Sequence, residues 1–136
     1  MFLLRRFIVL LFLALIAQSC RSVDPVRTFK NPILPSEFEA GADPAVFYID
    51  GVYYFYSTSK DRAVYKSTDL VHWEKGPVVL SDDFKGVWAP EIYHNPDDGR
   101  FYMYYTKRYK IGVAVADRPD AMFTDLGFIV LSGIDA

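Results

Sequence analysis

The fold is decided by one stretch of sequence, Ala42-Asp43-Pro44-Ala45-Val46-Phe47-Tyr48-Ile49-Asp50-Gly51-Val52-Tyr53-Tyr54-Phe55-Tyr56. Two runs of apolar, aromatic and β-branched residues flank Asp50-Gly51, a dipeptide that favours a two-residue hairpin turn. Pro44 can begin a strand and disfavours helical angles in the residue before it, so we expect Asp43 to be extended. The stretch therefore predicts a β-hairpin with a carboxylate at its entrance.

The same design recurs further along the chain. The run Ala89-Pro90-Glu91-Ile92-Tyr93-His94 is followed by Asp98-Gly99 and by a second aromatic run, Arg100 to Thr106. The end of the hairpin recurs too, because Ser57-Thr58 is matched by Tyr105-Thr106. The sequence therefore predicts two hairpins of one design.

This repeat places three carboxylates at corresponding positions. Asp43 and Glu91 are 48 residues apart (91 − 43), which is also the spacing of the turn aspartates Asp50 and Asp98 (98 − 50). A third copy begins at Gly133-Ile134-Asp135-Ala136. We predict that Asp43, Glu91 and Asp135 share one structural position, although each of them alone could equally be a turn cap.

Repeats of about 40 to 50 residues with four short strands each are typical of β-propeller blades. The outer strands of blade one are expected at Ala63 to Ser67 and around Trp73 to Leu80. The four strands of blade two are expected at Glu91 to His94, Arg100 to Thr106, Ile111 to Ala116 and Phe128 to Leu131. The first strand of every blade lines the central channel, so the three carboxylates should converge at one end of it. The predicted class is all-β, a β-propeller of which this chain supplies about the first two blades and the start of the third.

Composition agrees with such a fold and excludes some functions. The chain has 136 residues, with 15 Lys plus Arg against 17 Asp plus Glu, and 17% of its residues are aromatic. This mildly acidic balance gives no sign of nucleic-acid binding. Aromatic side chains in sheets pack between blades and can also stack on a ligand.

Metal and cofactor sites are not expected. His72 and His94 do not have the spacing of paired metal ligands, so we interpret both as structural or surface residues. Asp97 and Asp98 lie beside a glycine turn and are interpreted as solvated, with a structural calcium ion as the alternative.

Residues 1–19 have the pattern of a signal peptide of the lipoprotein type. Arg5 and Arg6 precede an apolar run, Phe7 to Ala17, that is too short to span a bilayer comfortably. Cys20, the only cysteine, follows directly and resembles a bacterial lipidation site, although Ala17 stands where such sites usually carry Leu. We expect lipid on Cys20, a membrane as partner, and a place in the bacterial cell envelope, with periplasmic or secreted export as the alternative. Residues 20–30 would form a tether and residues 31–136 the domain.

The motifs in their order resemble glycoside hydrolase family 43, whose five-bladed propellers include arabinofuranosidases, xylosidases and endo-arabinanases. The marks are Asn31-Pro32-Ile33-Leu34, Ala42-Asp43-Pro44, Ser67-Thr68-Asp69-Leu70-Val71-His72-Trp73, Trp88-Ala89-Pro90-Glu91 and Ile134-Asp135. The resemblance implies that Asp43 is the general base and that Asp135 orients the general acid and adjusts its pKa. It implies that Glu91, where the family usually has Asp, supports the substrate site without donating the proton. Trp88 either stacks on a sugar or packs.

The resemblance implies hydrolysis of O-glycosidic bonds in arabinose- or xylose-containing plant polysaccharide, with inversion. The family acid is a glutamate of a later blade, which no residue here reaches, so we expect the reading frame to continue and this piece alone to be inactive. The main alternative is a surface lipoprotein that binds glycan without cleaving it. A related propeller, such as a fructosidase or a phosphorylase of mannosides, is disfavoured because its opening motif differs from Ala42-Asp43-Pro44.

Overall fold

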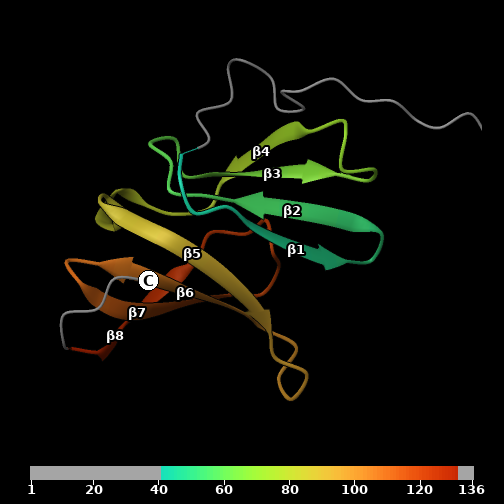
Figure 1. Ribbon diagram of the computed structural model, residues 1–136. Coiled ribbons are helices and arrows are strands. Elements are labelled where there is room, and N and C mark those ends of the chain that lie inside the picture. The colour runs from blue at the N-terminus through green and yellow to red at the C-terminus, as the bar shows by residue number, and fades with distance from the viewer. Residues whose placement is uncertain (1–40, 132–136) are drawn as a thin grey trace, which may run out of the picture.

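The structure, a computed structural model that describes residues 41–131, consists of two four-stranded antiparallel sheets (Figure 1). The first sheet contains β1 (Ala45–Ile49), β2 (Val52–Tyr56), β3 (Ala63–Ser67) and β4 (Glu74–Val78), and the second contains β5 (Val87–His94), β6 (Phe101–Lys107), β7 (Lys110–Ala116) and β8 (Thr124–Val130). Each strand pairs with the next one along the chain, as in a propeller blade. The all-β class and the two blades are confirmed. The expected start of blade three, the leader and the tether lie outside the described residues.

The first hairpin forms as its turn predicts. Asp50 and Gly51 both have positive φ, at 50° and 82°, and Ile49 pairs directly with Val52. Two consecutive residues with positive φ are the mark of the turn whose twist matches that of paired strands.

The second hairpin has a longer turn than the first, which changes the spacing of the repeat. The Asn95 N–H donates to the Arg100 carbonyl, so four residues, 96–99, form this turn, whereas two separate Ile49 and Val52. Ala45 pairs with Tyr56 just after the proline of blade one, as Glu91 pairs with Tyr104 just after that of blade two, so the spacing between blades is 46 residues in the first strands (91 − 45) and 48 in the second strands (104 − 56). The spacing of 48 counted between the turn aspartates therefore applies to the second strands but not to the first strands.

Some element boundaries differ from those expected. β5 begins at Val87, ahead of the expected start at Glu91, because Pro90 occupies a register shift inside the strand where its missing N–H costs nothing. β8 begins at Thr124 instead of Phe128. The connection between the sheets, expected to be irregular, contains one 3-10 turn, η1 (Asp82–Phe84).

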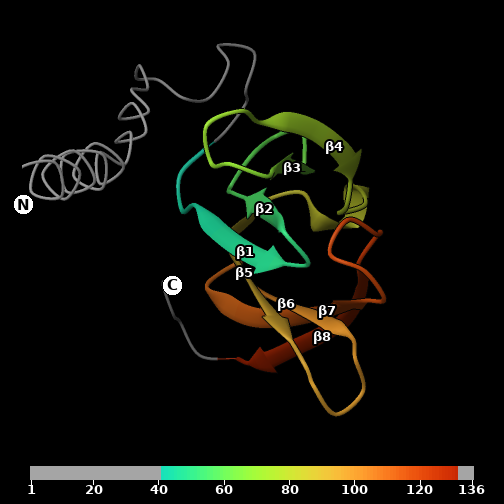
Figure 2. The ribbon, with the colours of Figure 1, turned by 90° about the vertical axis from the view of Figure 1, so that its right-hand side faces the viewer.

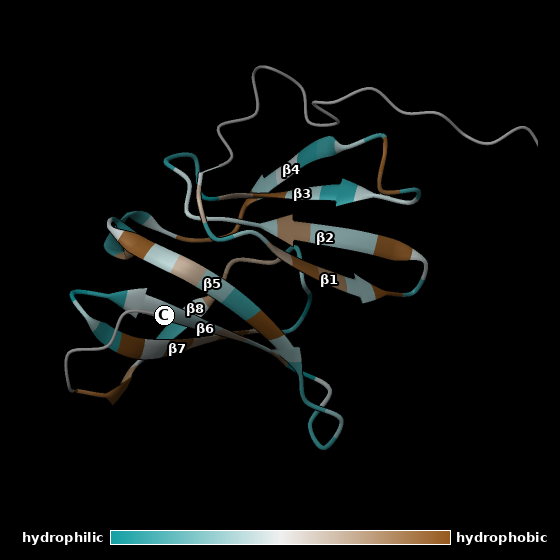
Figure 3. Ribbon diagram, in the orientation of Figure 1, coloured by the Kyte–Doolittle hydropathy of each residue, from teal (hydrophilic) through white to brown (hydrophobic). Residues whose placement is uncertain are grey.

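The hydrophobic core lies between the two sheets. Phe47 of β1 meets Phe101 of β6 edge to face, with ring centroids 5.8 Å apart, and Met103 beside it is completely buried. Hydrophobic stretches occur on the strands of both sheets (Figure 3), and buried members of this core come from both. The sheets therefore pack face to face, as neighbouring blades do.

Packing of the sheets brings their first strands together. β1 and β5 are in contact and lie side by side in both ribbon views (Figures 1 and 2). A buried hydrogen bond joins the two sheets at another place, where the Tyr56 hydroxyl of β2 donates to the carbonyl of Pro119, between β7 and β8, at 2.6 Å. Burial raises the pKa of the Tyr56 phenol, so the hydroxyl keeps its proton and remains a donor.

The aromatic and acidic residues of the outer strand region have structural roles. Trp73 packs edge to face on Phe55 at 5.7 Å, and its indole N–H donates to the Leu70 carbonyl. Asp69 accepts hydrogen bonds from two backbone N–H groups and from the exposed His72. The hydrogen bond from His72 is the main cause that lowers the pKa of Asp69.

Residues 41–131 contain neither a cluster of metal-ligating side chains nor a helix that could span a membrane. Within this range no three His, Cys, Asp or Glu side chains gather as metal ligands would, including around Asp97 and Asp98. His94 instead stacks on the ring of Phe101 at 4.6 Å. The same part of the chain has no helix with the length and apolar character needed to cross a membrane.

The core predicts a matched pair of stability changes. Met103 is 0% exposed, whereas Met122 is 52% exposed. We expect Met103→Ala to lower the free energy of unfolding by about 2–5 kcal/mol, because it removes buried methylene groups and leaves a cavity. Met122→Ala should change it by no more than about 0.5 kcal/mol. Urea unfolding followed by circular dichroism measures both, and equal effects would show that Met103 is not in the core.

Candidate active site

Asp43 is exposed and lies two residues before β1, at the end of the blade where its first strand begins. Its carboxylate accepts a hydrogen bond from the Thr58 hydroxyl, with 2.8 Å between Oγ1 and Oδ2. The adjoining backbone is paired as well, because the Thr58 N–H donates to the Ala42 carbonyl at 2.9 Å. The predicted position of Asp43 at a strand entrance is confirmed.

Thr58 connects this carboxylate to the second blade. Its Oγ1 also accepts a hydrogen bond from the Ala89 backbone N–H of β5, at 2.9 Å. One hydroxyl group therefore lies between the entrance of the first blade and the start of the second. Asp43 is held at the junction of the two blades.

The backbone of Asp43 is not extended as its proline neighbour predicts. Asp43 has φ 56°, and Ala89, which also precedes a proline, has φ 49°. At both places two residues of the first strand face one residue of the second, so each entrance is a β-bulge. Bulges re-aim side chains and tolerate left-handed residues, and aspartate adopts this region more readily than most. The bulge thus overrides the local preference imposed by Pro44.

Glu91 does not share the position of Asp43. The register pairs Glu91 with Tyr104, inside the ladder of the second blade. The two bulges match Asp43 with Ala89, so the first strands are 46 residues apart (89 − 43) and the counterpart of Glu91 in blade one is Ala45, which pairs with Tyr56 as Glu91 pairs with Tyr104. The prediction of a shared position is therefore wrong for Glu91, because the spacing was counted across two turns of unequal length. Asp135, the third predicted carboxylate, lies outside the described residues, as does Cys20.

Trp88 lies beside the entrance of β5 and is half-buried. Its ring meets the ring of Tyr109 edge to face at 5.6 Å, and Tyr109 is 64% exposed. The indole is therefore held by an aromatic neighbour while part of it remains open to solvent. This arrangement fits either of the two roles considered for Trp88.

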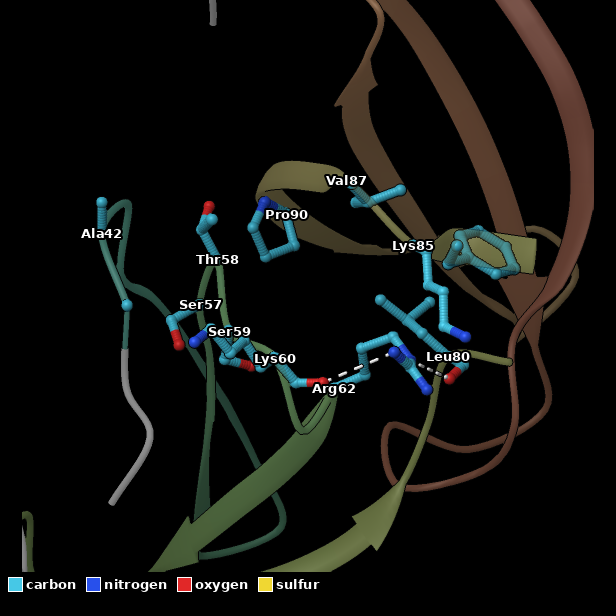
Figure 4. A pocket seen from close by; sticks show the side chains of 13 residues that line it. Ala42, Ser57, Thr58, Ser59, Lys60, Arg62, Leu80, Lys85, Val87 and Pro90 are labelled. Atoms are coloured by element: carbon cyan, nitrogen blue, oxygen red, sulfur yellow. Dashed lines mark hydrogen bonds between the residues drawn. The ribbon is translucent and has the colours of Figure 1, made fainter. Parts of the chain in front are cut away.

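A cavity of about 810 Å³ opens next to Asp43, between the two blades (Figure 4). Asp43 itself does not line it, but its neighbours Ala42 and Thr58 do. The wall is made by the connection from β2 to β3 and by the connection from β4 to β5. Its polar residues are Ser57, Thr58, Ser59, Lys60, Arg62 and Lys85, and its apolar residues include Leu80, Phe84, Val87 and Pro90.

Arg62 holds the two walls of the cavity together. Its Nε donates to the Leu80 carbonyl at 3.0 Å, and its Nη2 pairs with Asp82 at 2.6 Å. The guanidinium side chain is largely covered, whereas the Lys60 and Lys85 residues are exposed. The cavity therefore offers hydroxyl groups, two exposed amines and an apolar wall, a combination suited to a polar ligand with apolar faces.

Comparison with known proteins decides the family. Glycosyl hydrolases family 43 matches residues 29–136 of this sequence. The chain belongs to this family. The resemblance seen in the sequence motifs is confirmed.

Individual relatives agree with the assignment to family 43. The chain is similar to the extracellular endo-alpha-(1->5)-L-arabinanase of Thermotoga petrophila, with 31% identity over 117 residues that cover 67% of this chain and 24% of that protein. It is similar to a xylosidase/arabinosidase of Bacteroides ovatus, with 29% identity over 127 residues that cover 72% of this chain and 38% of that protein. The solved endo-1,5-alpha-L-arabinanase of Thermotoga petrophila aligns with a TM-score of 0.59 and 26% identity, over 78% of this chain and 27% of that one. The chain thus spans about a quarter to two fifths of the length of these family 43 relatives.

Sequence reasoning missed the role of Thr58. The match of Ser57-Thr58 with Tyr105-Thr106 is confirmed, because Thr58 bonds to Ala42 before the first bulge and Thr106 pairs with Trp88 before the second. The match did not show that the Thr58 hydroxyl contacts a carboxylate. A hydroxyl beside a strand end is a weak signal on its own, and only the pairing of β1 with β2 shows what it contacts.

The left-handed backbone at Ala89 predicts the sign of the stability change that follows when this residue is replaced by glycine. An alanine at φ 49° is strained, whereas glycine adopts this region freely, so Ala89→Gly should leave stability unchanged or raise the free energy of unfolding by up to about 1 kcal/mol. Ala114→Gly, at a buried position within β7, should lower it by at least about 0.5 kcal/mol. Denaturant titration measures both variants, and a destabilised Ala89→Gly protein would contradict the bulge.

Proposed function

We propose that the protein to which this chain belongs is a glycosidase that hydrolyses O-glycosidic bonds of arabinose- or xylose-containing plant polysaccharide with inversion of configuration. The observation that carries the proposal is the exposed Asp43 carboxylate, held at the junction of two blades in a chain of family 43. Relatives named as an arabinanase and as a xylosidase/arabinosidase support the substrate class. Because these matching relatives are named as hydrolases, a protein that only binds glycan is not favoured.

In the proposed reaction Asp43 is the general base. Its carboxylate removes a proton from a water molecule while the water oxygen attacks the anomeric carbon of the sugar. A carboxylic acid elsewhere in the protein protonates the leaving oxygen as the C–O bond breaks. Inverting enzymes hold these two groups roughly 6.5–9.5 Å apart to leave room for the water. This mechanism needs no metal ion or cofactor.

Two further residues complete the proposal. Asp135 would orient the acid and adjust its pKa, as the resemblance implies. Glu91 and Trp88, both of β5 and both near the junction, would contact the substrate, with the indole as a stacking surface. The cavity beside Ala42 and Thr58 is lined by neither Trp88 nor Glu91, and its hydroxyl groups and apolar wall could accept a sugar unit next to the one being cleaved.

The first prediction of this proposal concerns Asp43. In the product of the complete reading frame, Asp43→Asn should lower kcat/KM by about 10⁴-fold or more, because the amide keeps the shape but cannot accept a proton. Asp135→Asn should cost less and move one limb of the pH profile, and Glu91→Gln should weaken activity without abolishing it. Initial rates on an aryl arabinoside and an aryl xyloside against pH measure these effects.

Asp97→Asn is the matched control, because Asp97 is exposed in the turn between β5 and β6. It should retain the activity of the unchanged protein. NMR spectroscopy of the first product formed reports its anomeric configuration. A product with retained configuration, or full activity of Asp43→Asn, would overturn the proposed mechanism.

We also propose that the protein is exported and anchored by lipid on Cys20. Two relatives, from Thermotoga petrophila and Bacillus subtilis, are named as extracellular, which supports export. The basic start, the short apolar run and the adjoining Cys20 support the lipid anchor.

The anchor is tested by Cys20→Ala, with Ser19→Ala as the neighbouring control. We expect Cys20→Ala to abolish incorporation of radiolabelled palmitate and to move the protein from the detergent phase to the aqueous phase of Triton X-114. Ser19→Ala should behave like the unchanged protein. Unaltered labelling and partitioning of Cys20→Ala would rule out lipidation at this residue.

A further inference from the structure

We infer that Thr58 is a positioning residue for the base, and that its hydroxyl selects which oxygen of Asp43 accepts the proton. The inference rests on the proposed function of Asp43. It is carried by two hydrogen bonds that meet at one atom, Thr58 Oγ1 to Asp43 Oδ2 at 2.8 Å and Ala89 N to Thr58 Oγ1 at 2.9 Å.

The direction of both hydrogen bonds follows from the groups involved. A backbone N–H can only donate, so Thr58 Oγ1 must be the acceptor in its contact with Ala89. The hydroxyl has one proton, and the ionised carboxylate of Asp43 can only accept it. The Thr58 hydroxyl therefore accepts from the Ala89 amide and donates its one proton to Asp43 Oδ2.

This donation distinguishes the two carboxylate oxygens. Oδ2 is occupied by the hydroxyl, and within residues 41–131 no hydrogen bond involves Oδ1 of Asp43. Asp43 is exposed, so a water molecule can reach Oδ1. Oδ1 is therefore the oxygen that takes the proton, while the bond to Oδ2 fixes the plane of the carboxylate.

The hydroxyl itself is held from both sides. Thr58 is half-buried, and its own N–H is bonded to the Ala42 carbonyl next to Asp43. The Ala89 N–H belongs to a residue with positive φ in the paired strand β5, so its direction is set by the bulge. The orientation of Asp43 thus depends on the position of the second blade as well as on its own.

The charged groups on the adjoining elements are Lys60, Asp61 and Arg62 after β2, Asp82, Asp83 and Lys85 before β5, and Glu91 within β5. Replacing Thr58 leaves these charges in place. A change in kcat of a Thr58 variant can therefore be assigned to the lost hydroxyl.

The experiment compares Thr58→Val, which keeps the shape without the hydroxyl, with Thr58→Ser, which keeps the hydroxyl. It uses the product of the complete reading frame and an aryl arabinoside as substrate. Because a hydrogen bond to a charged group is lost, Thr58→Val should lower kcat about 10- to 100-fold while KM changes less than about threefold. Thr58→Ser should restore most of kcat.

Thr68→Val is the matched control, since Thr68 is exposed in the turn after β3, and it should match the unchanged protein. If Thr58→Val does not fold, as judged by circular dichroism, Thr58→Ala is the second hydroxyl-free variant and is judged by the same readouts. Unchanged kcat in the hydroxyl-free variant would overturn the inference, as would a Thr58→Ser protein that loses as much kcat as the hydroxyl-free variant. Asp43→Asn is measured in parallel: full activity there defeats the proposed function itself, whereas inactive Asp43→Asn beside unaffected Thr58→Val defeats only the role of Thr58.

Discussion

The face-to-face packing of the two sheets is the contact on which the rest of this structure depends. Phe47 of the first sheet meets Phe101 of the second, and Met103 is sealed between them. Because each sheet buries one face against the other, β1 and β5 lie next to each other. The entrance of the first blade then comes within hydrogen-bonding distance of β5, which is what allows one threonine to contact both Asp43 and Ala89. The site is in this sense a product of the core.

Most of the fold could be predicted because its signals are local. Asp50-Gly51 has the chemistry of a tight turn, and the runs on either side are rich in the aromatic and β-branched residues that favour strands. The recurrence of this pattern predicted a second sheet of the same kind, and the structure contains it. Such signals depend on neighbouring residues alone, so they can be read without knowing what lies across the sheet.

The candidate site could be predicted only in part, because it depends on register. Asp43 was identified correctly as a residue at a strand entrance, but Glu91 was assigned to the same position by a spacing taken across unequal turns. The match of Thr58 with Thr106 was correct, but what the Thr58 hydroxyl contacts depends on the register of β1 against β2, which a spacing does not contain. The positive φ of Asp43 was missed for a related reason, since a bulge is a property of two paired strands. No single strand contains that information.

The two bulged entrances have a consequence for how such a protein can diverge. Asp43 carries a carboxylate and Ala89 only a methyl group, yet both precede a proline and both have nearly the same φ, 56° and 49°. The backbone shape is therefore independent of the side chain that it presents. The side chain at a blade entrance can therefore change from a methyl group to a carboxylate, or the reverse, while the backbone of the entrance keeps its geometry.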